Sequence, residues 1–158
     1  EYVYEDSDGK EVTVPSYETY LARYVSETEE LGAVPVIVTS ITRRLYLSNP
    51  NTMGGYPQAA KAFAQSRGTA CIDMYKYSTE LLTKLGDEGS KELYLWLDAE
   101  DSRYMSDPRY TAANNKLRGA KQEDNSHFTY YGAGIFASEI ARQLGEKFSS
   151  LAGSIKKN

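Results

Sequence analysis

Hydrophobic residues recur along this chain with two different periods. Over residues 17–31, apolar and aromatic side chains fall three or four positions apart, which places them on one face of a helix. The same period returns later, so we predict further helices over residues 56–67, 74–85 and 130–151. Two short apolar runs, at residues 34–39 and 69–73, are typical of strands that are buried on both sides.

The order of these segments predicts the fold class. Helices that alternate with short apolar strands indicate right-handed βαβ crossovers, a parallel sheet and helices on both of its faces. We therefore predict an α/β protein with three layers, α/β/α. Two strands cannot cover four helices, so the sheet is expected to be incomplete, with its missing strands upstream of Glu1.

The remaining segments have a weaker hydrophobic pattern. Residues 1–16 are acidic and rich in turn formers, and we predict an exposed lead-in loop there, followed by one domain over residues 17–158. Residues 87–97 are expected to be helical first and extended afterwards. Residues 98–124 are polar and irregular, which is typical of a long functional loop. Their acidic stretch, 98–101, is expected to be solvated rather than to bind calcium.

Composition and charge exclude several classes of protein. With 158 residues, of which 41% are hydrophobic and 25% charged, the chain is long and apolar enough for one folded core. A net charge of -4 argues against nucleic acid as a partner, and the short apolar runs argue against a membrane span. The single cysteine, Cys71, and the lack of a His/Cys cluster predict no internal disulfide, no metal site and no cofactor. An opening residue other than Met indicates a processed chain or a fragment, and we favour a secreted or extracytoplasmic location without assigning the compartment.

His127 is the single histidine of the chain and follows Asp124 by three residues. In a turn, this spacing brings a carboxylate to the imidazole Nδ1–H, which fixes the tautomer and leaves Nε2 as a general base for a nucleophile. The position ahead of the last helix is where catalytic loops gather in α/β sheets. Phe128 is expected to pack and to hold this loop. The alternative is that Asp124 only shapes a turn and His127 is a surface residue at the helix entry.

Several motifs occur in a fixed order along the chain: Gly-Ala-Val-Pro-Val-Ile-Val-Thr-Ser-Ile-Thr-Arg-Arg at 32–44, Gly-Tyr-Pro-Gln-Ala at 55–59, Cys-Ile-Asp-Met at 71–74, Leu-Gly-Asp-Glu-Gly-Ser-Lys at 85–91, and Asp-Asn-Ser-His-Phe-Thr-Tyr-Tyr-Gly-Ala at 124–133. Together they resemble the C-terminal portion of SGNH (GDSL-type) hydrolases of the rhamnogalacturonan acetylesterase branch. The resemblance extends from about residue 17 to residue 144, apart from a stretch at 98–122 that is expanded.

This resemblance implies a flavodoxin-like fold and a serine ester hydrolase that removes acetyl groups from pectic polysaccharide. Asp124 and His127 would be the acid and base members of its Ser-His-Asp triad. The family's nucleophilic Ser lies in a Gly-Asp-Ser block, and its oxyanion-hole Gly and Asn lie in two further blocks, none of which occurs here. Ser7 lacks the glycine and the preceding strand, so we do not take it as the nucleophile. The expected partners are an acetylated polysaccharide and the N-terminal part of the same enzyme, on another chain or removed.

Arg43 and Arg44 follow the first predicted strand, at the edge where open α/β sheets bind ligands. A guanidinium pairs well with the carboxylate of an acidic sugar such as galacturonate, so both are candidate substrate-binding residues. The alternative is a solvated or salt-bridged arginine.

The chain has 14 tyrosines, a density that suits either a carbohydrate-binding surface or a half-buried core. Tyr94 with Trp96, and Tyr130 with Tyr131, are the pairs that we consider for stacking on sugar rings. Two other functions stay open beside the acetylesterase. One is a non-catalytic carbohydrate-binding or interaction module, and the other is a different lipase or esterase of the same superfamily.

Overall fold

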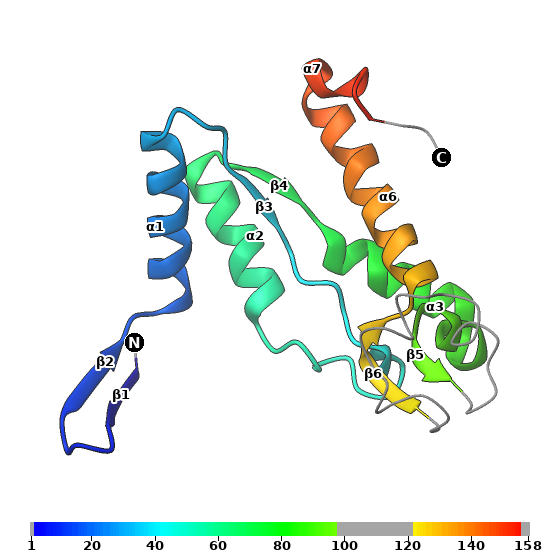
Figure 1. The fold of residues 1–158 in the computed structure, drawn as a ribbon, viewed down its shortest axis with the longest axis horizontal. Coiled ribbons are helices and arrows are strands. Elements are labelled where there is room, and N and C mark those ends of the chain that lie inside the picture. Colours follow the sequence, from blue (N-terminus) through cyan, green and yellow to red (C-terminus); the bar gives the residue numbers. More distant parts are fainter. Residues whose placement is uncertain (1, 98–121, 156–158) are drawn as a thin grey trace, which may run out of the picture. The chain divides into compact units, whose positions relative to one another are not determined.

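The computed structural model describes residues 2–97 and 122–155, and the chain divides into two compact units (Figure 1). The first unit consists of Glu1–Ser40 and Met53–Tyr75, and the second of Ile41–Thr52 and Lys76–Asn158. Each unit combines helices with short strands, so the predicted α/β class is confirmed. No helix among the described residues is long and apolar enough to cross a membrane.

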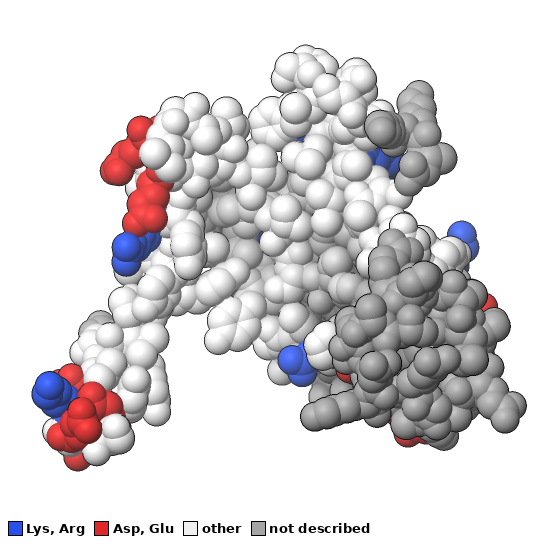
Figure 2. Space-filling view, in the orientation of Figure 1, with Lys and Arg blue, Asp and Glu red and all other residues white. Residues whose placement is uncertain are grey.

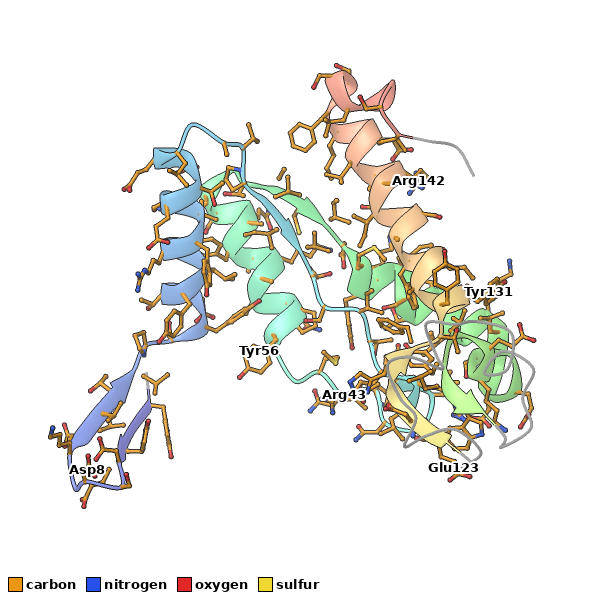
Figure 3. The ribbon with its side chains drawn as sticks, viewed as in Figure 1. Asp8, Arg43, Tyr56, Glu123, Tyr131 and Arg142 are labelled. Atoms are coloured by element: carbon orange, nitrogen blue, oxygen red, sulfur yellow. The ribbon has the colours of Figure 1, made fainter. Side chains whose placement is uncertain are left out.

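The first unit begins with an antiparallel β-hairpin of β1 (Tyr2–Glu5) and β2 (Glu11–Val14). The Asp6 carboxylate shapes its turn by accepting the backbone N–H groups of Asp8 and Lys10, both at 2.9 Å. Charged side chains gather at this turn, where Asp8 lies (Figures 2 and 3). The segment is largely exposed, as predicted for residues 1–16, but residues 2–14 form a hairpin in place of the predicted loop. Residues 11–14, after the Asp-Ser-Asp-Gly turn, alternate between polar and apolar side chains, whereas residues 2–4 before it are all apolar or aromatic, so only the turn and the second strand carry a hairpin signal.

The rest of the first unit contains, in chain order, α1 (Tyr17–Glu30), β3 (Val36–Val38), α2 (Tyr56–Arg67) and β4 (Ala70–Ile72). The two strands pair in parallel, with Ile37 opposite Cys71, as the sequence predicts. Their side chains form one core with both helices, centred on Val25, Ile37, Ala60 and Ala64. Helix α2 ends at Gly68, which adopts a left-handed conformation with φ 67°.

The second unit contains η1 (Arg44–Leu47), most of α3 (Met74–Ser90), η2 (Lys91–Leu93), β5 (Tyr94–Leu97), β6 (Gln122–Phe128), α6 (Tyr130–Lys147) and α7 (Ser149–Ala152). Gly86 interrupts α3 with φ 68° and ψ -172°, close to the predicted helix end, but helical turns resume after it. Strands β5 and β6 form an antiparallel pair that the sequence pattern does not reveal. Phe128 packs as expected, with its ring centroid 5.2 Å from that of Tyr94 and 4.8 Å from that of Phe136. Most of the predicted loop over 98–124, including the acidic stretch 98–101, lies outside the described residues.

Candidate active site

Asp124 and His127 lie on β6, inside a wide bulge of the β5–β6 ladder. Trp96 pairs with Glu123 and Tyr94 pairs with Phe128, so β5 has one residue between the paired positions while β6 has four, 124 to 127. These additional residues cannot follow the regular ladder and loop out of it. The sequence predicts a turn in a loop here, and the structure instead places the turn within a strand.

Within the bulge, Asp124 organises the backbone around it. One carboxylate oxygen, Oδ1, accepts the backbone N–H of Ser126 at 2.7 Å and that of His127 at 3.0 Å. The other oxygen, Oδ2, lies 2.6 Å from His127 Nδ1. The predicted contact between the two side chains is therefore confirmed. We call Asp124 and His127 the dyad.

The electrostatics of the dyad favour an ionised carboxylate. Partial burial alone would raise the pKa of Asp124, but the N–H donors of His127 and Ser126 and the neighbouring imidazole outweigh it and lower the pKa. An ionised Asp124 only accepts hydrogen bonds, so a neutral His127 places its proton on Nδ1 and leaves Nε2 as the basic nitrogen. The His127 side chain is 77% exposed, which makes this nitrogen accessible to a substrate.

The segment after the dyad is fixed by two residues that the sequence analysis does not single out. Thr129 Oγ1 caps α6 by accepting the Gly132 N–H at 3.0 Å, and it donates to the Glu92 carbonyl at 2.7 Å. Gly132 lies so close to η2 that a Cβ there would come within 2.1 Å of the Leu93 carbonyl oxygen. A threonine at the start of a helical pattern is the sequence signal for the cap. The close approach at Gly132 has no such signal.

The two arginines of the sequence prediction have different environments. Arg43 is exposed and precedes η1, where its side chain is labelled in Figure 3. Arg44 is only 6% exposed, and its guanidinium bonds the Asp87 carboxylate at 2.9 Å. The guanidinium also lies over the Trp96 ring, 4.1 Å from its centroid. Helix η1, which begins at Arg44, contacts β6, the strand that carries the dyad.

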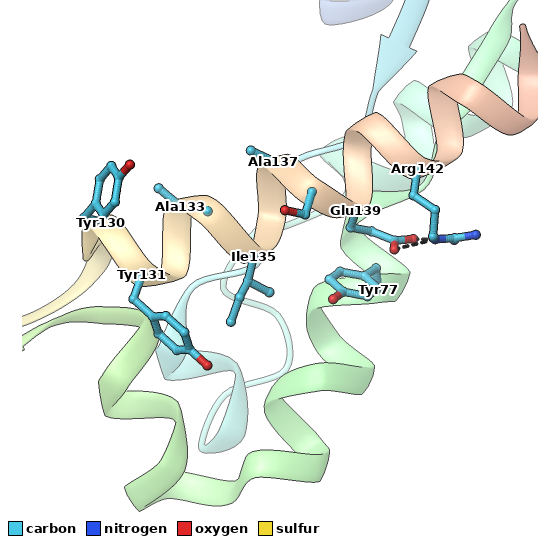
Figure 4. Close-up of a pocket in the computed structure, with 10 residues that line it drawn as sticks. Tyr77, Tyr130, Tyr131, Ala133, Ile135, Ala137, Glu139 and Arg142 are labelled. Atoms are coloured by element: carbon cyan, nitrogen blue, oxygen red, sulfur yellow. Dashed lines mark hydrogen bonds and ion pairs between the residues drawn. The ribbon is translucent and has the colours of Figure 1, made fainter. Parts of the chain in front are cut away.

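An open groove of about 900 Å³ lies along α6 and α3. Figure 4 shows Tyr131 and Ile135 of α6 and Tyr77 of α3 around it. Tyr130 also lines the groove, and both tyrosines at the start of α6 are more than half exposed. Tyr94, in contrast, is fully buried and belongs to the core. We call this feature the α3–α6 groove.

The described residues hold no cluster of three or more His, Cys, Asp or Glu side chains that could bind a metal ion. Ser7 lies in the hairpin turn of the first unit. The described part of the chain thus presents an exposed imidazole in contact with a carboxylate.

Comparison with known proteins gives a relative of named activity. The chain is 30% identical over 144 residues to the rhamnogalacturonan acetylesterase RhgT of Bacillus subtilis (strain 168), and the match covers 89% of the chain. It covers 55% of the relative, so the chain spans about half the length of the curated relative it matches. No family model matches the chain, and no solved structure matches it.

Proposed function

We propose that this chain is the base-bearing part of a carboxylic ester hydrolase that removes acetyl groups from a pectic polysaccharide. The observation that carries the proposal is the 2.6 Å contact between Asp124 and His127 in a chain similar to a rhamnogalacturonan acetylesterase. The proposed nucleophilic serine and oxyanion donors belong to the N-terminal part of the same enzyme, which is the proposed protein partner. The acetylated polysaccharide is the proposed substrate, and a secreted or extracytoplasmic location would give access to it.

In the proposed reaction, His127 Nε2 removes the serine proton as the hydroxyl oxygen attacks the acetyl carbonyl. The imidazolium that forms is stabilised by the Asp124 carboxylate, which keeps the ring oriented through Nδ1–H. His127 then gives the proton to the sugar oxygen, which leaves as an alcohol. In the second half, His127 takes a proton from water, the hydroxide attacks the acetyl-serine, and acetate leaves as the serine regains its proton.

Arg43 is the arginine that we propose to bind the polysaccharide. Its side chain is exposed, whereas the Arg44 guanidinium is buried against Asp87 and Trp96. A forked guanidinium donates two parallel hydrogen bonds to a carboxylate, which suits a galacturonate residue near the acetyl ester. We expect Arg43→Gln to raise KM for an acidic polysaccharide and to leave hydrolysis of a small neutral acetyl ester unchanged.

A chimaera tests the proposal directly. This chain would replace the aligned part of the Bacillus acetylesterase, and acetate release from acetylated rhamnogalacturonan would be measured. We expect a folded, active chimaera in which His127→Ala lowers kcat by at least about 10³-fold. Glu146→Gln, on an exposed position of α6, is the matched control and should leave kcat unchanged. A folded chimaera that is inactive, or one that keeps its activity with His127→Ala, would contradict the proposal.

The α3–α6 groove supports a second candidate function, a non-catalytic carbohydrate-binding module. Exposed tyrosines beside a groove provide flat apolar faces for sugar rings, and Tyr130 and Tyr131 both line it. This function predicts that the 158-residue chain binds the polysaccharide by itself and that Tyr131→Ala weakens binding. His127→Ala should leave this binding affinity unchanged, and this result separates the binding function from the esterase proposal.

A further inference from the structure

Two residues of β5, Tyr94 and Trp96, pair with β6 on either side of the bulge that carries the dyad. Both of them also contact residues 42–44. Tyr94 and Trp96 are the β5 positions at which regular pairing with β6 stops and resumes. The Tyr94 hydroxyl donates to the Thr42 carbonyl at 2.6 Å. The Trp96 ring lies under the Arg44 guanidinium at 4.1 Å. We call residues 42–44 the clamp.

The clamp is itself fixed to α3. The backbone N–H of Thr42 donates to the Ser78 hydroxyl at 3.0 Å, and Arg44 bonds Asp87 at 2.9 Å. Burial raises the pKa of Tyr94, so its hydroxyl keeps the proton that it donates to the clamp. The clamp therefore contacts α3 through Ser78 and Asp87, and it contacts β5 through Tyr94 and Trp96.

We propose that Arg44 is a positioning residue of the dyad, acting through Trp96 and the β5–β6 pairing, and not a substrate-binding residue. Its guanidinium is buried and already has an ion pair and an aromatic face as partners. Trp96 pairs with Glu123, the residue immediately before Asp124. A change in the position of Trp96 would therefore move Glu123 and, with it, the Asp124 carboxylate that orients the imidazole.

The shape of the guanidinium matters to this role. A planar, delocalised guanidinium stacks flat on an indole ring and still directs an N–H toward Asp87. The compact ammonium of lysine cannot make both contacts in this way. Lys91 already approaches the Trp96 ring, with Nζ 5.4 Å from the centroid, and a second ammonium there would not reproduce the stacking. Charge alone should therefore not replace Arg44.

The experiment uses the single histidine as its reporter. In the 158-residue chain, the ¹⁵N resonances of one imidazole report the tautomer of His127 without overlap. We expect the Nδ1–H tautomer in the native chain, because Asp124 accepts from that nitrogen. Arg44→Met and Arg44→Lys should both lose this preference and show a mixture of tautomers. Asp124→Asn sets the signal expected for complete loss.

Two matched controls remove a positive charge and leave the contacts of Thr42 and Arg44 in place. Arg43→Gln acts one residue away, and Lys84→Gln lies at an exposed position of α3; both should retain the native tautomer. If they lose it as Arg44→Met does, the effect is a general change of charge and the proposal is wrong. An unchanged tautomer in a folded Arg44→Met chain would also overturn it.

Folding is checked in each variant by backbone amide spectra. If Arg44→Met does not fold, Trp96→Leu removes the stacking partner while Arg44 keeps Asp87, and it should cause the same loss of the Nδ1–H tautomer. A native tautomer in Trp96→Leu would then overturn the proposal.

The catalytic part of this inference rests on the proposed function, and kinetics test it separately. In the esterase chimaera, a positioning role predicts that Arg44→Met lowers kcat with little change in KM, whereas a substrate-binding role predicts a raised KM. Lys84→Gln should change neither value. The tautomer measurement needs no activity, so a chain without hydrolysis but with tautomer loss in Arg44→Met would reject the esterase and keep the positioning role.

Discussion

At the scale of single residues, Asp124 performs two tasks with one side chain. Its Oδ1 atom accepts two backbone N–H groups that set the shape of the bulge, and its Oδ2 atom orients the imidazole of His127. The i to i+3 spacing makes this contact predictable from the sequence, because a turn returns the chain over that distance. The burial of Arg44 was not predictable, because nothing in a pair of arginines indicates which of them faces Trp96.

Replacing Asp124 with asparagine separates the two tasks. Asn keeps a carbonyl oxygen that can accept the backbone N–H groups, but its amide nitrogen cannot accept from Nδ1–H. We expect Asp124→Asn to fold normally, to lose the Nδ1–H tautomer and to lower kcat in the chimaera by about 10²–10⁴-fold. If Asp124→Asn keeps the native kcat, Asp124 only shapes the turn and does not take part in catalysis.

Acid should remove the stabilising effect of Asp124. Its pKa is lowered in the folded chain, so the ionised carboxylate contributes stability above the unfolded pKa of about 3.9. This contribution is lost as the pH falls through the lower, folded pKa. We expect the difference in unfolding free energy between the native chain and Asp124→Asn to shrink below about pH 4. Urea unfolding at a series of pH values measures it, and a difference independent of pH would contradict the assignment.

At the scale of secondary-structure elements, the joint between β6 and α6 holds the site in register. Thr129 caps α6 and bonds η2, while Gly132 lets the first turn of α6 approach the Leu93 carbonyl. Long periodic helices such as α6 were predictable from hydrophobic spacing. Strand β6, with the polar sequence Gln-Glu-Asp-Asn-Ser-His-Phe, was not, because its extended form depends on pairing with β5 rather than on its own residues.

The two positions of this joint should respond differently to substitution with alanine. Thr129→Ala removes the cap and a buried hydrogen bond, and we expect a loss of about 1–2 kcal/mol in unfolding free energy. Thr129→Ser keeps the hydroxyl and is the matched control. Gly132→Ala places a Cβ 2.1 Å from a carbonyl oxygen, so α6 must move and the loss should exceed that of Thr129→Ala. The opposite order in thermal or urea unfolding would show that the close approach is not maintained.

At the scale of the whole molecule, the parallel pair of β3 and β4 is a small sheet. Within the described residues this pair has no third strand, and Val38 at the end of β3 is 44% exposed. Parallel sheets are normally covered on both faces and extended by further strands. In the proposed enzyme, the N-terminal part would supply the strands that extend this sheet.

Hydrogen exchange tests this completion. We expect the amides of Val36–Val38 to exchange faster in the 158-residue chain than in the chimaera, where added strands would protect them. Amides inside α2 serve as the internal reference, because their hydrogen bonds stay within the helix. Equal exchange of Val36–Val38 in both proteins would show that the proposed N-terminal part does not extend this sheet.

The bulge in β6 also has a consequence for how the site tolerates change in length. Because Glu123 and Phe128 are each paired with β5, the register is fixed on both sides of residues 124–127. An insertion or deletion between these two anchors alters the reach of the imidazole without reversing the inward and outward faces of the strand. The length of residues 124–127, whose backbone is held by the Asp124 carboxylate, can therefore change without a change in the pairing of β5 with β6 or in the start of α6.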